Sequence, residues 1–358
     1  MTPVTIGIIG AGNVARSIHL PGLRLCRDVN VAAICSPIPG EAQSCGVPGA
    51  YLAYEEVLQR ADIDAIVVAT PTFLHPEIVI RAAEAGKHVL CEKPLALNLA
   101  AAREMYAAAE KAGVVHMTAF TYRFTPAVQY LKHLVDEGAL GSLRTVRAAY
   151  LMALSSHLLG WRSTAAHAGS GVLADIGSHL VHLVQFLAGE IESVSASQMK
   201  FRQDPASDVE DWIAFLADMQ GGVCATFEIS RVCPGRGAGI SENMTIELYG
   251  SDGAAAFSLQ DPWGLEVALG EDGSDPARPM RRCEVPTEFL RLPGSVRDVH
   301  DGDPRWSYRY DQQFQFVESV RLGRSRAPTL LDGVRCQAVL DAALESAQTR
   351  KWIKVAQA

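Results

Sequence analysis

The sequence lacks any segment that concentrates lysine and arginine. Its 358 residues carry 40 acidic and 32 basic side chains, a formal net charge of −8, and no basic cluster offsets this excess. Nucleic acids and anionic membrane surfaces attract proteins through concentrated positive charge. We therefore expect neither of them as a partner.

Long apolar runs are also missing. No run approaches the roughly 20 apolar residues that a membrane-crossing helix requires. The N-terminal stretch MTPVTIGIIGAG has neither the basic region nor the apolar region of a signal peptide, and it has the pattern of a strand. These absences predict a cytoplasmic protein without a membrane segment.

Cysteine pairs of the kinds that bind metals are absent too. The eight cysteines include no C-x-x-C pair and no zinc-site spacing. We expect reduced thiols, most of them small core residues, and no metal site.

The first third of the chain alternates short apolar runs with amphipathic stretches. The runs VTIGII, VNVAAIC, IDAIVVAT, KHVLC and VVHMTAF have the pattern of buried strands. HPEIVIRAAEAGK and NLAAAREMYAAAEKAG between them indicate helices, the second with Asn98 as N-cap and Gly113 as its end. Strands that are apolar on both faces and separated by helices predict a doubly wound parallel sheet, a Rossmann domain over residues 1–124.

The sequence pattern changes in the remainder of the chain, residues 125–358. DWIAFLADMQGGVCATFEISR and MTIELYGSDGAAAFSLQ each contain two strand-like runs around a turn. They predict an α+β domain with a large, mainly antiparallel open sheet. We expect loops over residues 258–306 and a helix in DGVRCQAVLDAALESAQTRKW. An open sheet with an uncovered face predicts a homodimer or homotetramer formed through that sheet.

A glycine motif follows the first predicted strand. Gly10 permits a tight turn, Gly12 allows a pyrophosphate to approach the backbone, and Ala15 allows the next helix to pack closely. Asn13 and Val14 open that helix, whose free N–H groups would hold the phosphates. The motif predicts a bound dinucleotide.

The choice between NAD and NADP stays open at this point. The second predicted strand runs into Ser36 and Pro37, with no acidic residue until Glu41 and no nearby arginine or lysine. An acid there would hold the ribose hydroxyls of NAD, and a base would hold the 2′-phosphate of NADP. We lean towards NAD because an unpaired phosphate is costly to desolvate.

The stretch VLCEKPLALN, residues 89 to 98, ends a buried strand in a charged turn. Pro94 restricts the backbone of Lys93 and makes a cis bond accessible. Lys93 is thereby fixed at the carboxyl end of a parallel strand, where doubly wound sheets bind ligands. The alternative is an ordinary surface lysine in a turn.

A polar triplet occurs in GSGVLADIGSHLVHLVQFLAG. Asp175, His179 and His182 stand at i, i+4 and i+7, which places them on one face of a helix. Such a triplet beside an apolar face is either a catalytic group or a satisfied structural network.

Taken together, these motifs resemble the Gfo/Idh/MocA oxidoreductase family. The glycine motif, ATPTFLH at 69 to 75, EAGKHVLCEKPLA at 84 to 96, YRFTP at 122 to 126 and GSGVLADIGSHLVHL at 169 to 183 occur in order over nearly the whole chain. The sequence is similar to the inositol and sugar dehydrogenases of that family.

The resemblance implies roles for individual residues. Lys93 would contact the reacting hydroxyl, Asp175 would lie beside it, and His179 would act as acid and base. The residues implied at the cofactor, besides those of the glycine motif, are Ser36, Thr70, Pro71, His75, Glu92 and Lys93. The residues implied at the substrate are Lys93, Tyr122, Arg123, Trp161, Arg162, Asp175, His179 and His182.

Two positions depart from the family pattern. His182 stands where the family commonly has aspartate, and Thr121 stands where it commonly has asparagine. If His182 faces the substrate, we expect fewer hydroxyls there, or an anionic or glycosidic group; a satisfied histidine at the edge of the core is the other possibility.

The sequence therefore predicts an NAD(P)-dependent dehydrogenase that acts on a secondary hydroxyl of a sugar, cyclitol or sugar derivative. One alternative is a redox-neutral enzyme that holds NAD tightly and cleaves or epimerises a sugar through transient oxidation. Another is a dinucleotide-sensing protein, but a sensor would need none of Lys93, Asp175 and His179.

Overall fold

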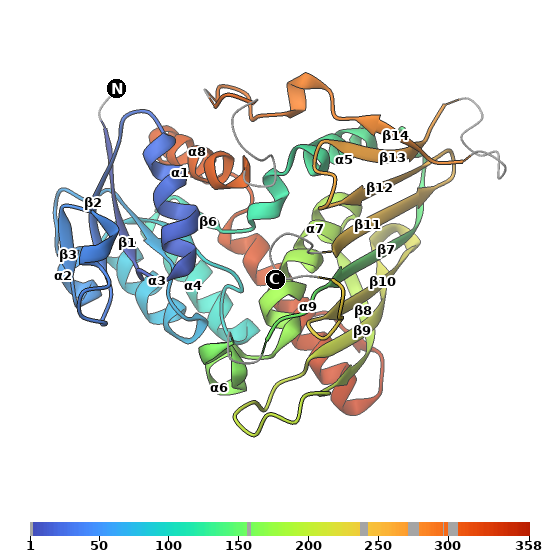
Figure 1. Cartoon of the computed structure of the whole chain (residues 1–358), viewed down its shortest axis with the longest axis horizontal. Coiled ribbons are helices and arrows are strands. Elements are labelled where there is room, and N and C mark those ends of the chain that lie inside the picture. Colours follow the sequence, from blue (N-terminus) through green and yellow to red (C-terminus); the bar gives the residue numbers. More distant parts are fainter. Residues whose placement is uncertain (1–2, 156–158, 237–242, 271–278, 296, 300–306) are drawn as a thin grey trace.

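The computed structural model describes residues 3–155, 159–236, 243–270, 279–295, 297–299 and 307–358. Two sheets lie in separate parts of the molecule, with helices between and around them (Figure 1).

The first sheet is parallel and has the strand order β3-β2-β1-β4-β5-β6. Its strands are β1 (Val4–Ile9), β2 (Val29–Cys35), β3 (Gly49–Tyr51), β4 (Ala65–Val68), β5 (His88–Cys91) and β6 (His116–Thr118). The helices α1 (Leu20–Leu25), α2 (Tyr54–Leu58), α3 (His75–Glu84) and α4 (Leu99–Ala112) accompany it. Asn98 Oδ1 accepts the Ala101 N–H at 3.0 Å, and Gly113 ends α4 at a φ of +66°. The predicted Rossmann sheet is confirmed, and β3 is a short strand that the sequence pattern missed.

The second sheet has the order β14-β13-β12-β11-β7-β10-β9-β8-β15. Its strands are β7 (Leu143–Leu151), β8 (Ile191–Met199), β9 (Trp212–Met219), β10 (Val223–Ser230), β11 (Asn243–Gly250), β12 (Ala254–Ser258), β13 (Gly264–Ala268), β14 (Arg281–Glu284) and β15 (Ile353–Lys354). β7 and β10 pair in parallel, while both predicted hairpins, β9–β10 and β11–β12, are antiparallel. The expected large, mainly antiparallel sheet is confirmed.

The expectation of loops over residues 258–306 is wrong in part. β13 and β14 lie within this range and extend the sheet to its edge. β13 is short, and β14 carries Arg281, Arg282 and Glu284 on an exposed edge, so neither shows the apolar alternation of a covered strand. Residues 271–278, 296 and 300–306 of the predicted loop region lie outside the described residues.

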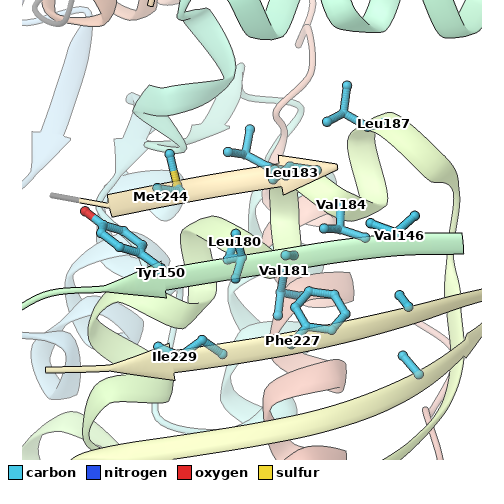
Figure 2. Close-up of a cluster of buried hydrophobic side chains, with 14 of the residues drawn as sticks. Val146, Tyr150, Leu180, Val181, Leu183, Val184, Leu187, Phe227, Ile229 and Met244 are labelled. Carbon is cyan, nitrogen blue, oxygen red and sulfur yellow. The ribbon is translucent and has the colours of Figure 1, made fainter. Parts of the chain in front are cut away.

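Helix α7 (Ser178–Ala188) forms the centre of the second core. Figure 2 shows its apolar side chains, among them Leu180 and Val184, against Val146 of β7 and Phe227 of β10. By length and composition alone the run Ala165–Ala188 could cross a membrane, but 78% of its most apolar stretch is buried in the protein. This is the pattern of a core helix.

The last helices connect the two sheets. α8 (Ser307–Leu322) lies beside α1 (Figure 1), where Phe316 and Val317 pack in the same buried cluster as Ile6. α9 (Leu330–Thr349) packs against both α4 and β8. The C-terminal segment thus returns to the first sheet, and the division at residue 124 remains a prediction.

Candidate active site

One cavity of about 850 Å³ contains most of the predicted site residues. This volume lies in the range of small-molecule and cofactor sites. The first part of the chain contributes Gly10, Gly12, Asn13, Val14, Ser36, Glu41, Thr70, Pro71, Glu92 and Lys93 to its lining. The second part contributes Trp161, Arg162, Ser170 and Asp175. The cavity therefore joins the carboxyl ends of the parallel strands to the segment that precedes α7.

The two glycines of the motif are required for different reasons. Gly10 has a φ of +100°, and a Cβ there would lie 2.4 Å from the Ala69 carbonyl oxygen. Gly12 has an ordinary φ, and a Cβ there would meet nothing within 4 Å. Gly10 is therefore required by the conformation and packing of the protein's own backbone, whereas the space beside Gly12 is free for a ligand. This arrangement fits a dinucleotide pyrophosphate, with the N–H groups at Asn13 and Val14 as its donors.

Replacing Gly12 with alanine is therefore expected to weaken NADH binding by about tenfold or more, ~1.4 kcal/mol, without changing the melting temperature. The added methyl group occupies only the ligand's space. Titration of NADH fluorescence and thermal melting measure the two quantities. Gly10→Ala is the contrasting variant, because its clash with Ala69 should lower the melting temperature. Wild-type NADH affinity in Gly12→Ala would contradict this account of the motif.

The end of the cavity near β2 contains the acidic residue Glu41, although Glu41 does not directly follow this strand in the sequence. The Ser36 hydroxyl donates a hydrogen bond to Glu41 Oε2, so the intervening loop folds the carboxylate back to the strand end. Arg16 Nη2 donates to the Glu41 main-chain oxygen at 3.0 Å and lies 3.9 Å from Oε1. The expectation that no base lies nearby is wrong, because Arg16 reaches this loop from the helical turn after the glycine motif.

Lys93 is largely buried and is not an ordinary surface lysine. Its Nζ donates to the Asp175 carbonyl oxygen at 2.6 Å and lies 4.0 Å from Asp175 Oδ1. The Lys93–Pro94 peptide bond is cis. Burial lowers the pKa of the Lys93 ammonium below its usual value, and the charges of Asp175 and Glu92 oppose that shift.

Asp175 connects the two parts of the site. Besides its contacts with Lys93, its Oδ1 lies 3.1 Å from Arg162 Nε, and the Arg162 guanidinium stacks over the Trp161 ring at 4.3 Å. The predicted helix is not regular at this point. Asp175 lies in a π-helical turn (Leu173–Gly177) that precedes α7, and the widened turn alters the simple i, i+4 geometry.

His179 lies in the first turn of α7 and is 8% exposed. Its Nδ1 is buried and has no hydrogen-bond partner among the described residues, and its ring meets Tyr122 edge-on at 4.6 Å. Burial lowers the pKa of His179 well below its usual value, and the charges of Lys93 and His182 add to the shift. The imidazole is therefore neutral and able to accept a proton.

His182 and Arg123 lie elsewhere. They line a separate cavity of about 400 Å³ together with Phe186 and Arg335. The His182 ring stacks on Phe120 at 3.9 Å, and the Arg123 guanidinium lies 3.8 Å from the centre of the Phe186 ring. One turn after His179, α7 directs its side chain towards a different cavity, so the lining of the main cavity does not support substrate contact by these two residues.

His75 lies behind the cavity wall. Its Nε2 is 3.0 Å from the Thr70 carbonyl oxygen, and its Nδ1 is 3.2 Å from those of Pro94 and Leu95. Burial lowers its pKa. His75 thus joins the loop after β4 to the loop after β5, and its predicted contact with the cofactor remains a prediction.

Within the described residues, no three His, Cys, Asp or Glu side chains are grouped so that they could hold a metal ion. The polar groups that converge on this part of the protein are Lys93, Asp175, Arg162 and, beside them, His179. Such a set can hold an oxygen atom and move its proton.

Comparisons with known proteins match both parts of this chain to one family. Residues 4–120 match the family described as "Oxidoreductase family, NAD-binding Rossmann fold", and residues 128–256 match "GFO/IDH/MocA C-terminal domain". A levoglucosan dehydrogenase of Pseudarthrobacter phenanthrenivorans is 30% identical over 341 residues, which cover 85% of this chain and 83% of that protein. An inositol 2-dehydrogenase of Rhizobium meliloti is 26% identical over 360 residues, which cover 99% of each.

Among solved structures, levoglucosan dehydrogenase in complex with NADH and levoglucosan has a TM-score of 0.89 and 29% identity, covering 99% of this chain and 100% of that chain. Its complex with NADH and L-sorbose has a TM-score of 0.90 and 29% identity, covering 100% of both. The residues that match these two family descriptions include strands of both sheets. The chain therefore belongs to the Gfo/Idh/MocA family of NAD-binding oxidoreductases.

Proposed function

We propose that this enzyme is an NAD-dependent dehydrogenase that oxidises a secondary hydroxyl of a ring sugar, a cyclitol or a derivative of either. The observation that carries the proposal is the position of Lys93 and Asp175 in the same cavity as the glycine motif, with His179 beside them. A dinucleotide sensor has no use for such proton-handling groups.

Each side chain has a distinct part in this reaction. NAD, when bound, would supply the hydride acceptor for the carbinol carbon. Lys93 Nζ, which Asp175 holds in place, donates a hydrogen bond to the substrate oxygen. Neutral His179 takes the hydroxyl proton, and burial keeps it in the form that can do so. Trp161 and Arg162 provide an apolar face and a donor beside the reacting group.

The relatives support a compact ring as substrate. They include a levoglucosan dehydrogenase, an inositol 2-dehydrogenase and a 1,5-anhydro-D-fructose reductase of Ensifer adhaerens. The levoglucosan dehydrogenase, which is 30% identical over 341 residues, makes an anhydrosugar the first candidate. The test is absorbance of the reduced nicotinamide with purified enzyme, NAD and a panel of anhydrosugars, glycosides, aldoses and inositols. A strong preference for inositol would contradict this choice of substrate class.

The position of Glu41 supports NAD over NADP. Its carboxylate at the end of β2 would accept hydrogen bonds from ribose hydroxyls and repel a 2′-phosphate. Glu41→Ala should lower the NAD/NADP ratio of kcat/KM by about tenfold or more, ~1.4 kcal/mol, since Arg16 would then face the phosphate without a competing acid. Glu84→Ala, at an exposed site on α3, is the matched control. An unchanged ratio in Glu41→Ala would refute the assignment.

We place the enzyme in the cytoplasm as a homodimer or homotetramer. The outer face of the second sheet includes Leu216 on β9, which is 52% exposed, beside small and polar side chains such as Thr226 and Ala214. A second copy of the chain would cover this face.

A further inference from the structure

Three side chains behind the cavity form a buried chain of hydrogen bonds. His19 Nε2 lies 2.9 Å from Glu92 Oε1, and Gln313 Nε2 lies 2.8 Å from His19 Nδ1. His19 and Gln313 are fully buried, and Glu92 is 8% exposed where it lines the cavity. Nothing in the proposed reaction uses His19 or Gln313 directly.

The order of donors along this chain indicates which ring nitrogen donates to Glu92. A Gln amide nitrogen only donates, so His19 Nδ1 accepts from it. His19 Nε2 then carries the ring proton and donates it to Glu92 Oε1. Glu92 therefore accepts a hydrogen bond from the ring.

The three residues come from distant parts of the sequence. His19 ends a π-helical turn (Ala15–His19) directly after the glycine motif, Glu92 follows β5, and Gln313 lies on α8. Gln313 and His19 are 294 residues apart. The widened turn places His19 inside the protein, and the return of α8 to the first sheet supplies its second partner.

Glu92 is thereby fixed beside Lys93. Its second oxygen accepts the Lys93 backbone N–H at 3.2 Å. Burial alone would raise the pKa of Glu92, but the hydrogen bond from His19 and the charge of Lys93 hold the pKa below its usual value. The titratable groups that act on this carboxylate, or on which it acts, are His19, Lys93, Cys91 and His75.

We infer that His19 and Gln313 are positioning residues that hold Glu92 as an oriented carboxylate at the nicotinamide end of the cavity, where it favours the cationic oxidised cofactor over the neutral reduced one. This inference rests on the proposed function in one respect, because the nicotinamide end is the end next to Lys93. The carboxylate would act as a fixed charge, and the two residues behind it would keep it ionised and in place.

The test compares two replacements of His19 that are similar in size. His19→Met removes the donor to Glu92. His19→Gln instead supplies an amide N–H that can extend as far as Nε2 does and donate to Glu92. Fluorescence titration gives the Kd of NADH, and displacement gives the Kd of NAD, both without substrate and from pH 6 to pH 9. The wild-type ratio of the two constants should be independent of pH.

In His19→Met we expect Glu92 to become protonated at the acid end of this range. The ratio of the NAD Kd to the NADH Kd should then rise on the order of tenfold at pH 6, the effect of about one pKa unit, and return towards the wild-type value at pH 9. His19→Gln should stay close to wild type, and Gln313→Leu should change the ratio in the same direction as His19→Met by a smaller factor. Equal, pH-independent weakening of both ligands in His19→Met would overturn the inference.

Glu92→Gln separates this inference from the function on which it rests. The neutral amide should raise the ratio at every pH. If Glu92→Gln raises it and His19→Met does not, the roles of His19 and Gln313 are refuted while the assignment of the cavity stands. If Glu92→Gln leaves the ratio unchanged, Glu92 is not beside the nicotinamide, and the orientation assumed in the proposed function is refuted with it.

Discussion

Replacing Lys93 with methionine is expected to lower kcat by about 10³-fold, in the range for loss of a general acid–base group, while the Kd of NADH changes no more than a few-fold. Methionine keeps the length of the side chain but removes the donor that would hold the substrate oxygen. The glycine motif, which would hold most of the cofactor, lies on other segments.

Steady-state kinetics and NADH titration measure these two effects separately. Lys111→Met, on the exposed side of α4, is the control for a lysine that has no contact with the cavity. Turnover within a few-fold of wild type in Lys93→Met would remove Lys93 from the reaction.

Replacing His179 with alanine is expected to lower kcat by about 10² to 10⁴-fold and to change the pH profile. The folded-state pKa of His179 is well below its usual value, so the wild-type imidazole remains neutral from pH 9 down past about 6.5, where an exposed histidine would take up a proton. The wild-type kcat/KM should therefore show no loss of activity near pH 6.5 that is due to this group. In the alanine variant, hydroxide and buffer replace the base, so the residual rate should rise with pH.

A pH series of kcat/KM for both proteins tests this expectation, and added imidazole should restore part of the lost rate. His133→Ala, at an exposed histidine on α5 (Pro126–Asp136), is the control. A wild-type acid limb centred near 6.5 that disappears in His179→Ala would show a histidine with an ordinary pKa, contrary to the buried site described here.

The sequence predicted the fold well wherever burial leaves a periodic signal. The strands β1, β2, β4, β5 and β6 are apolar on both faces and were predicted, as were α3, and α4 with its cap residues Asn98 and Gly113. Strand β3 and the edge strands β13 and β14 were missed, because short or exposed strands need not be apolar on either face. The path of α8 back to the first sheet depends on tertiary packing and has no signature in its own sequence.

The sequence predicted those parts of the candidate site whose residues lie within one local motif. Lys93 and Asp175 lie on separate motifs, and the structure brings them together. The acid at the end of β2 was missed because Glu41 reaches Ser36 through a loop conformation, and the His19–Glu92–Gln313 chain was missed because its members are far apart in the sequence. Periodicity placed His182 with His179, but the structure places His182 in the lining of a cavity separate from the one that contains Lys93 and Asp175.

The proposed reaction is the net oxidation of a secondary hydroxyl by NAD, and the reduced cofactor is released in each turnover. The most direct measurement is the amount of NADH formed per enzyme molecule, with a sugar from the substrate panel and excess NAD, alongside identification of the sugar product. We predict many equivalents of NADH and an equal amount of ketone. At most one equivalent, together with a cleaved or epimerised sugar, would contradict the claim and identify a redox-neutral enzyme that retains its cofactor.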